Sequence, residues 1–193
     1  MSGNVEFVIF PLNKEEIRRI LHEAKTKKMS IVPRGAGTNL VGSCIPEKAI
    51  VLDMTRMKSI KELNLQEQTV IVEPGVFLDD LNYLLSKYKL FFPIVPYSSP
   101  TIGGMVATNA YGKYSYRFGR MEEWIAELEI VDGKSRLFKT KEIKDFCGME
   151  AISGIITKIK LKVIPLINQR SISLYTFNKI SEIINKQYYS NIN

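Results

Sequence analysis

The stretch SIVPRGAGTNLVG, residues 30–42, leaves a β-type run at Ile31-Val32 and enters a loop that holds Gly35, Ala36 and Gly37. Glycines on both sides of an alanine let the backbone turn through positive φ and expose several N–H groups on one side. A concavity lined by such groups binds an anion, most often a phosphate. We therefore expect a phosphate-binding loop that directly follows a strand.

A second donor-rich segment is SSPTIGGMVATNA, residues 98–110. Thr101 is predicted to cap a short helix, which puts Gly103 and Gly104 in its first turn, where a ligand would approach free N–H groups. A diphosphate would lie between this helix start and the loop of residues 34–39, so a dinucleotide is favoured over a mononucleotide. A P-loop ending is absent, and the glycine spacing of the loop departs from G-x-G-x-x-G.

The remaining patterns predict an α+β fold. A strand at 5–10, a helix from Lys14 to about Lys28 capped by Asn13, and the Ile31-Val32 strand form a βαβ opening with parallel strands. The other predicted elements are a strand at 49–54, a strand pair at 58–64 and 69–75, a helix from Leu78, a proline-fixed loop at 91–100, a polar-aromatic loop at 111–120, a hairpin around Asp132-Gly133, a strand at 154–164, and a strand and helix at 171–189. We expect a small parallel sheet from the opening and a mainly antiparallel sheet from residues after about Thr101.

Composition narrows the class of protein. The chain has 193 residues, 45% of them hydrophobic, which suits one domain or one domain with a fragment. The net charge is +7, but the basic residues are scattered and match no nucleic-acid-binding motif, so no nucleic acid is expected. No apolar run is long enough for a membrane span, and no secretory signal is recognised, so a cytoplasmic location is expected. Cys44 and Cys147 lack metal-type spacing; reduced thiols are the simpler interpretation and a disulfide the alternative.

The motifs, taken together and in order, resemble a known family. PRGAGTNLVGS, VLDMTRMKSI, VIVEPGVFLDDLN, LFFP, TIGGMVATNAYG, RFG and G-x-E-x-x-x-G-I-I-T resemble the FAD-binding domain of the vanillyl-alcohol oxidase / p-cresol methylhydroxylase (PCMH-type) superfamily over about residues 5–164. The glycolate oxidase and D-lactate dehydrogenase branch is the most similar. The resemblance implies two α+β subdomains with FAD between them: a domain at 1–165, divided into about 1–95 and about 96–165, and a tail at 166–193 that resembles the start of a cap domain.

The resemblance also implies which residues bind FAD, from the pyrophosphate loop through the flavin and ribityl turn and the second channel wall to the adenosine. These are Arg34, Gly35, Ala36, Gly37, Thr38 and Asn39; Pro74 and Gly75; Pro96, Ser98, Thr101, Gly103, Gly104, Ala107 and Asn109; Arg117, Gly119, Glu123 and Ile125; and Gly148, Glu150, Gly154 and Ile155. No metal is implied.

Non-covalent FAD is expected. Family members that attach flavin through this loop have a histidine where this chain has Thr38. The single histidine, His22, falls on the first predicted helix and is interpreted as a surface residue. Cys44 follows the loop closely and is interpreted as a small, partly buried thiol rather than a tether. The sequence departs from the family at Tyr111, where glycine is usual.

The resemblance implies an FAD-dependent oxidoreductase, or the flavin subunit of a split one, that oxidises a small 2-hydroxy acid such as glycolate or D-lactate by hydride transfer to flavin N5. In the family a cap domain carries the substrate pocket and most catalytic side chains, so no catalytic residue is assigned here. Either the tail folds back on its own domain, or a partner chain completes the cap. The alternative functions are a non-catalytic flavin-binding or electron-transfer module that needs a partner chain, and a flavin-free remnant that binds a polyanion.

Overall fold

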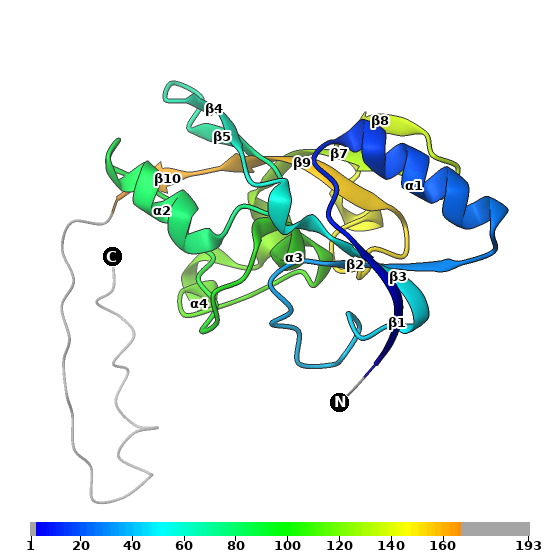
Figure 1. The fold of residues 1–193 in the computed structure, drawn as a ribbon. Helices are drawn as coiled ribbons and strands as arrows, with labels where there is room; N and C mark the ends of the chain where they lie inside the picture. The colour runs from blue at the N-terminus through cyan, green and yellow to red at the C-terminus, as the bar shows by residue number, and fades with distance from the viewer. Residues whose placement is uncertain (1–2, 167–193) are drawn as a thin grey trace, which may run out of the picture.

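The computed structural model describes residues 3–166 and contains two main sheets joined by helices (Figure 1). Figure 1 shows α1 beside the parallel strands at one end of the molecule, α2 with β10 at the other end, and α3 between them. The tail predicted to form a strand and helix at 171–189 lies outside the described residues. Within residues 3–166, no helix combines the length and apolarity needed to cross a bilayer.

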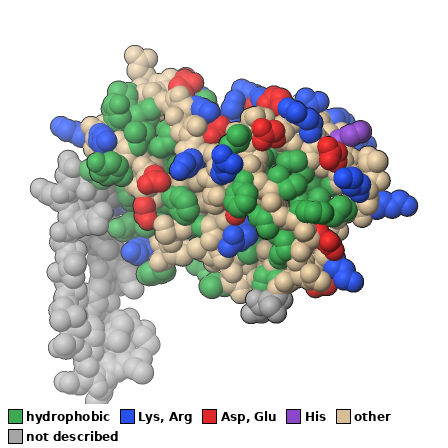
Figure 2. Space-filling view, in the orientation of Figure 1, with side chains coloured by type: hydrophobic (Ala, Val, Ile, Leu, Met, Phe, Trp, Pro, Cys, Tyr) green, Lys and Arg blue, Asp and Glu red, His purple; other side chains and the backbone are tan. Residues whose placement is uncertain are grey.

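The three-stranded sheet is parallel, with the order β1-β3-β2, and is built from β1 (Asn4–Ile9), β2 (Ser30–Arg34) and β3 (Glu47–Asp53). Helix α1 (Lys14–Thr26) connects β1 to β2, and its N-cap Asn13 accepts a hydrogen bond from the amide of Glu16. The predicted βαβ opening is therefore confirmed, although β3 lies between the two strands of the unit. Edge strand β1 exposes several apolar side chains, and Figure 2 shows hydrophobic side chains over this region.

The five-stranded sheet is antiparallel, with the order β4-β5-β9-β7-β8. Its strands are β4 (Ile60–Asn64), β5 (Thr69–Val72), β7 (Ile125–Val131), β8 (Leu137–Thr140) and β9 (Ile155–Lys162). The expectation that this sheet comes from residues after about Thr101 holds for β7, β8 and β9 but is wrong for β4 and β5, because β5 pairs with β9 and β4 pairs with β5. Val70 and Val72 are completely buried, and a two-stranded hairpin alone would leave them in water. The subdomain boundary at about residue 95 stays a prediction.

The remaining elements are short. They are α2 (Leu78–Ser86), β6 (Leu90–Phe91), α3 (Ile102–Ala107), α4 (Ser115–Phe118), β10 (Ile164–Pro165) and the 3-10 turns η1 (Met54–Arg56), η2 (Met121–Trp124) and η3 (Ile143–Asp145). The segment at 111–120, expected to be a loop throughout, contains the single helical turn α4. That turn forms because the amides of Arg117 and Phe118 donate to the carbonyl of Tyr114, and the Phe118 ring packs edge-on against Trp124.

The hairpin of β7 and β8 is confirmed, but its reversal is longer than a two-residue Asp-Gly turn. The Asp132 carboxylate accepts hydrogen bonds from the amides of Lys134 and Arg136, and Ser135 has a φ of 58°. The aspartate side chain therefore organises the turn by replacing backbone acceptors.

Two apolar clusters hold these elements together. The larger one lies between α2, α3 and the antiparallel sheet, with Leu81, Met105 and Ile159 among its fully buried members. The smaller one packs Ile17 of α1 against Leu52 of β3, and it also includes residues at the ends of β7 and β9. Because the second cluster takes side chains from both sheets, the C-terminal ends of β2 and β3 are held close to the antiparallel sheet.

Candidate nucleotide-binding site

Residues 35–39, which we call the glycine loop, follow β2 and turn over the side chain of Arg34. Gly37 has a φ of +71°, and a Cβ at this position would clash with the Arg34 guanidinium. Within residues 3–166, the amides of Ala36, Gly37 and Thr38 donate to no other group. The loop therefore offers adjacent backbone donors above a fixed positive charge, which is the arrangement expected of an anion-binding nest.

The loop and helix α3 meet at Gly35 and Thr101. A Cβ on Gly35 would clash with the hydroxyl oxygen of Thr101, whose side chain is almost fully buried. Thr101 is the N-cap of α3, and its Oγ1 accepts a hydrogen bond from the amide of Gly104 at 3.4 Å. The two donor-rich segments of the sequence are thus brought into direct contact, and the N-cap prediction is confirmed.

The expectation of free amides at the start of α3 is wrong. The amides of Ile102 and Gly103 donate to the carbonyls of Val76 and Pro74, both at 2.8 Å. The segment at 73–76 crosses the helix start, so these donors are already used inside the protein. A Cβ on Gly103 would lie 2.5 Å from the Cβ of Pro74, so this glycine is required by packing. Among the amides of the glycine loop and of the first turn of α3, the unused donors therefore lie in the glycine loop.

The Pro74-Gly75 turn rests on η1. Gly75 donates its amide to the carbonyl of Met57 at 2.8 Å, and a Cβ on Gly75 would clash with the carbonyl of Met54. Because Pro74 also packs on Gly103, the turn joins η1 to α3. Three segments of the predicted site are therefore brought together: the glycine loop, the Pro74-Gly75 turn and the start of α3.

Asp53 was not among the residues that sequence reasoning selected. It ends β3 in register with Arg34 at the end of β2, and its Oδ2 accepts from the Arg34 guanidinium at 3.4 Å. The available signal was a lone acid that ends the apolar run AIVL at 49–52, because the carboxyl ends of parallel strands are where such sheets build sites.

A second group of predicted residues gathers at the other end of α3. The amide of Gly148 donates to the carbonyl of Val106, and that of Glu150 donates to the carbonyl of Ala107. A Cβ on Gly148 would lie 3.2 Å from the Cβ of Asn109, whose side chain accepts a hydrogen bond from the amide of Glu122. The structure therefore joins Ala107 and Asn109 to the Gly148–Glu150 element.

Other predicted residues serve neighbouring backbone or the core. The Glu123 carboxylate lies against Gly119 and accepts a hydrogen bond from the amide of Arg120, so it organises η2. Ile125 and Ile155 are buried in the two apolar clusters. Four more of the predicted residues lie elsewhere. Gly154 lies against Ile130 of β7, Pro96 and Ser98 lie on the loop before α3, and Arg117 is an exposed residue of α4.

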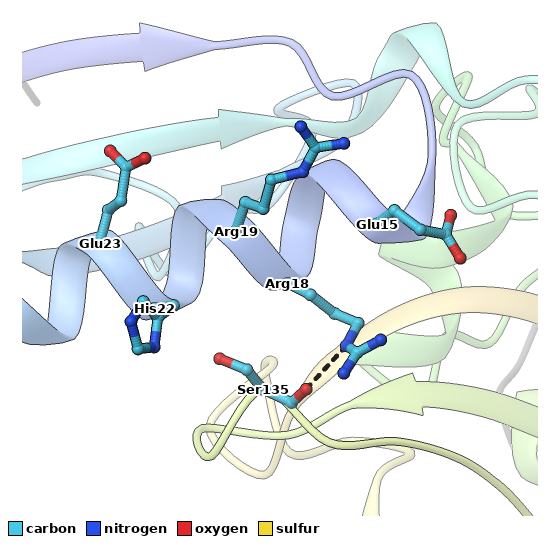
Figure 3. Close-up of a pocket in the computed structure, with 6 residues that line it drawn as sticks. All are labelled: Glu15, Arg18, Arg19, His22, Glu23 and Ser135. Carbon is cyan, nitrogen blue, oxygen red and sulfur yellow. Dashed lines mark hydrogen bonds between the residues drawn. The ribbon is translucent and has the colours of Figure 1, made fainter.

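One surface hollow of about 490 Å³ lies between α1 and the β7–β8 turn (Figure 3). It is lined by Glu15, Arg18, Arg19, His22, Glu23 and Ser135, and Arg18 donates to the carbonyl of Ser135 at 2.9 Å. None of the predicted FAD-binding residues lines this hollow, and its lining carries both signs of charge. His22 is therefore an exposed residue on α1 away from the glycine loop, as the sequence predicted.

The two cysteines are unpaired and differ in environment. Cys44 is half-buried in the loop after Gly37, whereas burial, with a smaller contribution from the Glu122 carboxylate, raises the pKa of Cys147 to about 12. No group of three or more potential ligands within residues 3–166 forms a metal site. Neither thiol is organised as a metal ligand.

The chain is similar in sequence to a known protein family and to several of its members. A protein-family model described as "FAD binding domain" matches residues 5–141. The mitochondrial D-lactate dehydrogenase (cytochrome) of Arabidopsis thaliana is 34% identical over 170 residues, which cover 82% of this chain and 30% of that protein. Glycolate oxidase subunit GlcD of Bacillus subtilis is 34% identical over 172 residues, which cover 82% of this chain and 37% of that protein.

A solved structure shares the fold. Alkyldihydroxyacetonephosphate synthase superposes with a TM-score of 0.78 at 24% identity, covering 84% of this chain and 32% of that chain. The present chain therefore spans about a third of the length of the relatives that it matches.

Proposed function

The chain belongs to the FAD-binding domain family, and from this premise we propose that it is the flavin-binding part of an oxidoreductase that acts on a small 2-hydroxy acid. The substrate class is supported by the names of its relatives, which include a D-lactate dehydrogenase, a glycolate oxidase subunit and a D-2-hydroxyglutarate dehydrogenase. The observation that carries the proposal is the set of unused amides at Ala36, Gly37 and Thr38 beside Thr101.

The residues present fit FAD at its most demanding point, the diphosphate. The glycine loop supplies free N–H donors, and the lack of a Cβ at Gly35 and Gly37 lets the loop lie directly against Thr101 and Arg34. We assign the diphosphate to this loop, the ribityl chain to the Pro74-Gly75 turn, and the adenosine to the group around Asn109 and Gly148. When bound, FAD supplies the redox chemistry by accepting a hydride at N5.

The protein's own contribution is to bind and orient. Arg34 places a permanent positive charge beneath the loop, which favours a diphosphate over a neutral ligand. The contacts of Gly35 with Thr101 and of Pro74 with Gly103 hold the loop, turn and helix in one arrangement before any ligand arrives. Such preorganisation lowers the entropy cost of binding.

Non-covalent attachment is part of the proposal. Thr38 cannot form a link to flavin of the kind that a histidine makes, and Cys44 is the one thiol close to the loop in sequence. Acid precipitation of the flavin-loaded protein should release all flavin into the supernatant, from wild type and Cys44→Ser alike. Retention of flavin in the wild-type pellet alone would assign a covalent link to Cys44.

A partner completes the proposed enzyme. We propose that the substrate pocket is formed with a further polypeptide that supplies the cap, and the support is that one relative is itself named as a subunit. The alternative, a flavin-binding or electron-transfer module without turnover of its own, predicts the same cofactor but no reduction by a 2-hydroxy acid.

The test begins with the bound cofactor. Protein purified in its cellular complex should show a flavin spectrum, and the mass of the released cofactor should be that of FAD. Anaerobic D-lactate or glycolate should then bleach the spectrum. A colourless protein that binds no added FAD, or one that releases FMN, would overturn the FAD assignment. Bleaching by neither acid in the intact complex would favour the alternative module.

A further inference from the structure

Asp53 lies between two parts of the site. It ends β3 directly beside the end of β2, and only 5% of its surface is exposed. A carboxylate so deeply buried requires hydrogen-bond and ion-pair partners inside the protein. The structure provides these partners from two different directions.

Each carboxylate oxygen of Asp53 holds a different segment. Oδ2 accepts from Nη1 of Arg34 at 3.4 Å, and the Arg34 guanidinium lies directly beneath Gly37 of the loop. Oδ1 accepts from the amide of Thr55 at 3.0 Å and from the Thr55 hydroxyl at 2.5 Å, and Thr55 lies within η1. Because Gly75 packs on η1, one side chain connects the glycine loop with the Pro74-Gly75 turn.

We propose that Asp53 is a positioning residue for the FAD diphosphate, which fixes the glycine loop through Arg34 and the Pro74-Gly75 turn through Thr55. The inference rests on the proposed function, because it assumes that the loop takes the diphosphate. Without Asp53 the half-exposed Arg34 side chain loses its anchor and moves into solvent, and the loop then loses the support beneath Gly37.

The direction in which Asp53→Asn changes the affinity for a diphosphate distinguishes a positioning role from a purely electrostatic one. A carboxylate near an anion site repels the ligand, so a purely electrostatic role predicts that Asp53→Asn binds diphosphates more tightly. A positioning role predicts the opposite, because the amide cannot form the ion pair that orders Arg34. For one charged hydrogen-bonded contact, the expected loss is about tenfold in Kd.

The experiment measures Kd for FAD, ADP and riboflavin on wild type and Asp53→Asn. We expect FAD and ADP to weaken by about the same factor, roughly tenfold, and riboflavin, which has no diphosphate, to be unchanged. Unchanged or tighter binding of FAD and ADP would overturn the inference. If wild type binds neither FAD nor ADP, the proposed function itself fails, and the inference fails with it.

Glu129→Gln is a matched control for the loss of a buried carboxylate. Glu129 is also 5% exposed and also binds a threonine hydroxyl, that of Thr157 at 2.9 Å, together with the cations Lys14 at 3.1 Å and Lys158 at 3.9 Å, but it joins α1 to β7 and β9. We expect this variant to lose stability without changing the Kd for ADP. An equal loss of ADP affinity in Glu129→Gln would reduce the Asp53 effect to general destabilisation.

Two further variants keep the test decisive if Asp53→Asn folds poorly. Thr55→Val removes only the hydroxyl contact and should weaken ADP by about threefold, and no change would contradict the link to η1. In an Arg34→Gln background, Asp53→Asn should add little further loss, since its main partner is already absent. Full additivity of the two losses would show that Asp53 does not act through Arg34.

Discussion

Gly103 donates its amide hydrogen to the carbonyl oxygen of Pro74 at 2.8 Å, and a Cβ on the glycine would lie 2.5 Å from the Cβ of the proline. The start of α3 is therefore covered by protein, although it is the end of a helix that ordinarily attracts anions. The two glycines of this turn have different roles: Gly103 packs against Pro74, and Gly104 lies next to the hydroxyl of Thr101. Substitution of each glycine separates these roles.

We expect Gly103→Ala to destabilise the fold by about 1–3 kcal/mol, because the added methyl group must push Pro74 away. Gly104→Ala in the same turn meets only Oγ1 of Thr101 at 3.2 Å and gains helix propensity, so it should stay within about 1 kcal/mol of wild type. Urea unfolding of both variants measures the difference. Equal stabilities would contradict the packing role assigned to Gly103.

Gly37→Ala should weaken FAD by about tenfold while the protein remains folded, because alanine at a φ of +71° is strained and its methyl group displaces Arg34. The matched control is Gly133→Ala, which has no atom within 4 Å of its Cβ and should change neither stability nor affinity. Fluorescence quenching of added FAD provides the measurement, and equal affinities for the two variants would refute the role of the loop.

Glu73 makes the free energy of unfolding depend on pH in the acid range. Burial alone would raise the pKa of this carboxyl, but Lys61 and the backbone of Ser59 outweigh burial and hold the pKa below its ordinary value of 4.5. Below about pH 4.5 the unfolded state therefore binds more protons than the folded state, and the contribution of Glu73 to stability is lost as pH falls through its folded-state pKa.

Glu73→Gln should consequently lower the free energy of unfolding at pH 7 and show a shallower loss of stability as the pH falls below the ordinary carboxyl pKa of 4.5. Urea titrations at several pH values supply both quantities. A variant with the same acid slope as wild type would assign the acid sensitivity to other carboxylates.

The two thiols should react at very different rates. With a pKa of about 12, roughly one Cys147 thiol in ten thousand is ionised at pH 8, and the side chain is also buried. Cys44 is half-buried and should react first, so a thiol-disulfide reagent should label one group per native chain and two after unfolding. Rapid labelling of both groups in the native protein would contradict the burial of Cys147.

Local patterns predicted the elements well because their causes are local. Asn13 caps α1 with its own side chain, and Thr101 caps α3 in the same way. The loop that the family motifs indicate does have free amides at 36–38, and its role in binding the cofactor stays a prediction. Where a residue's hydrogen-bond partners lie within a few positions, the sequence pattern predicts the local structure.

The errors came from partners that are distant in sequence. The amides at the start of α3 are occupied by residues 74 and 76, and the second edge of β5 is paired with β9. Asp53 was missed because its importance depends on Arg34, which lies in an adjacent strand rather than nearby in the chain. Register between strands and hydrogen-bond partners across segments are set by tertiary packing, which single-sequence patterns do not encode.

The pairing of β5 with β9 also governs how this chain is made. Val70 lies opposite Leu161, so the hairpin of β4 and β5 leaves the ribosome about ninety residues before the strand that completes its sheet. At roughly 5–20 residues per second, that edge waits for on the order of ten seconds with its backbone groups and valines uncovered. A truncation before Ile155 should therefore accumulate as an aggregate, even though the glycine loop is already complete in it.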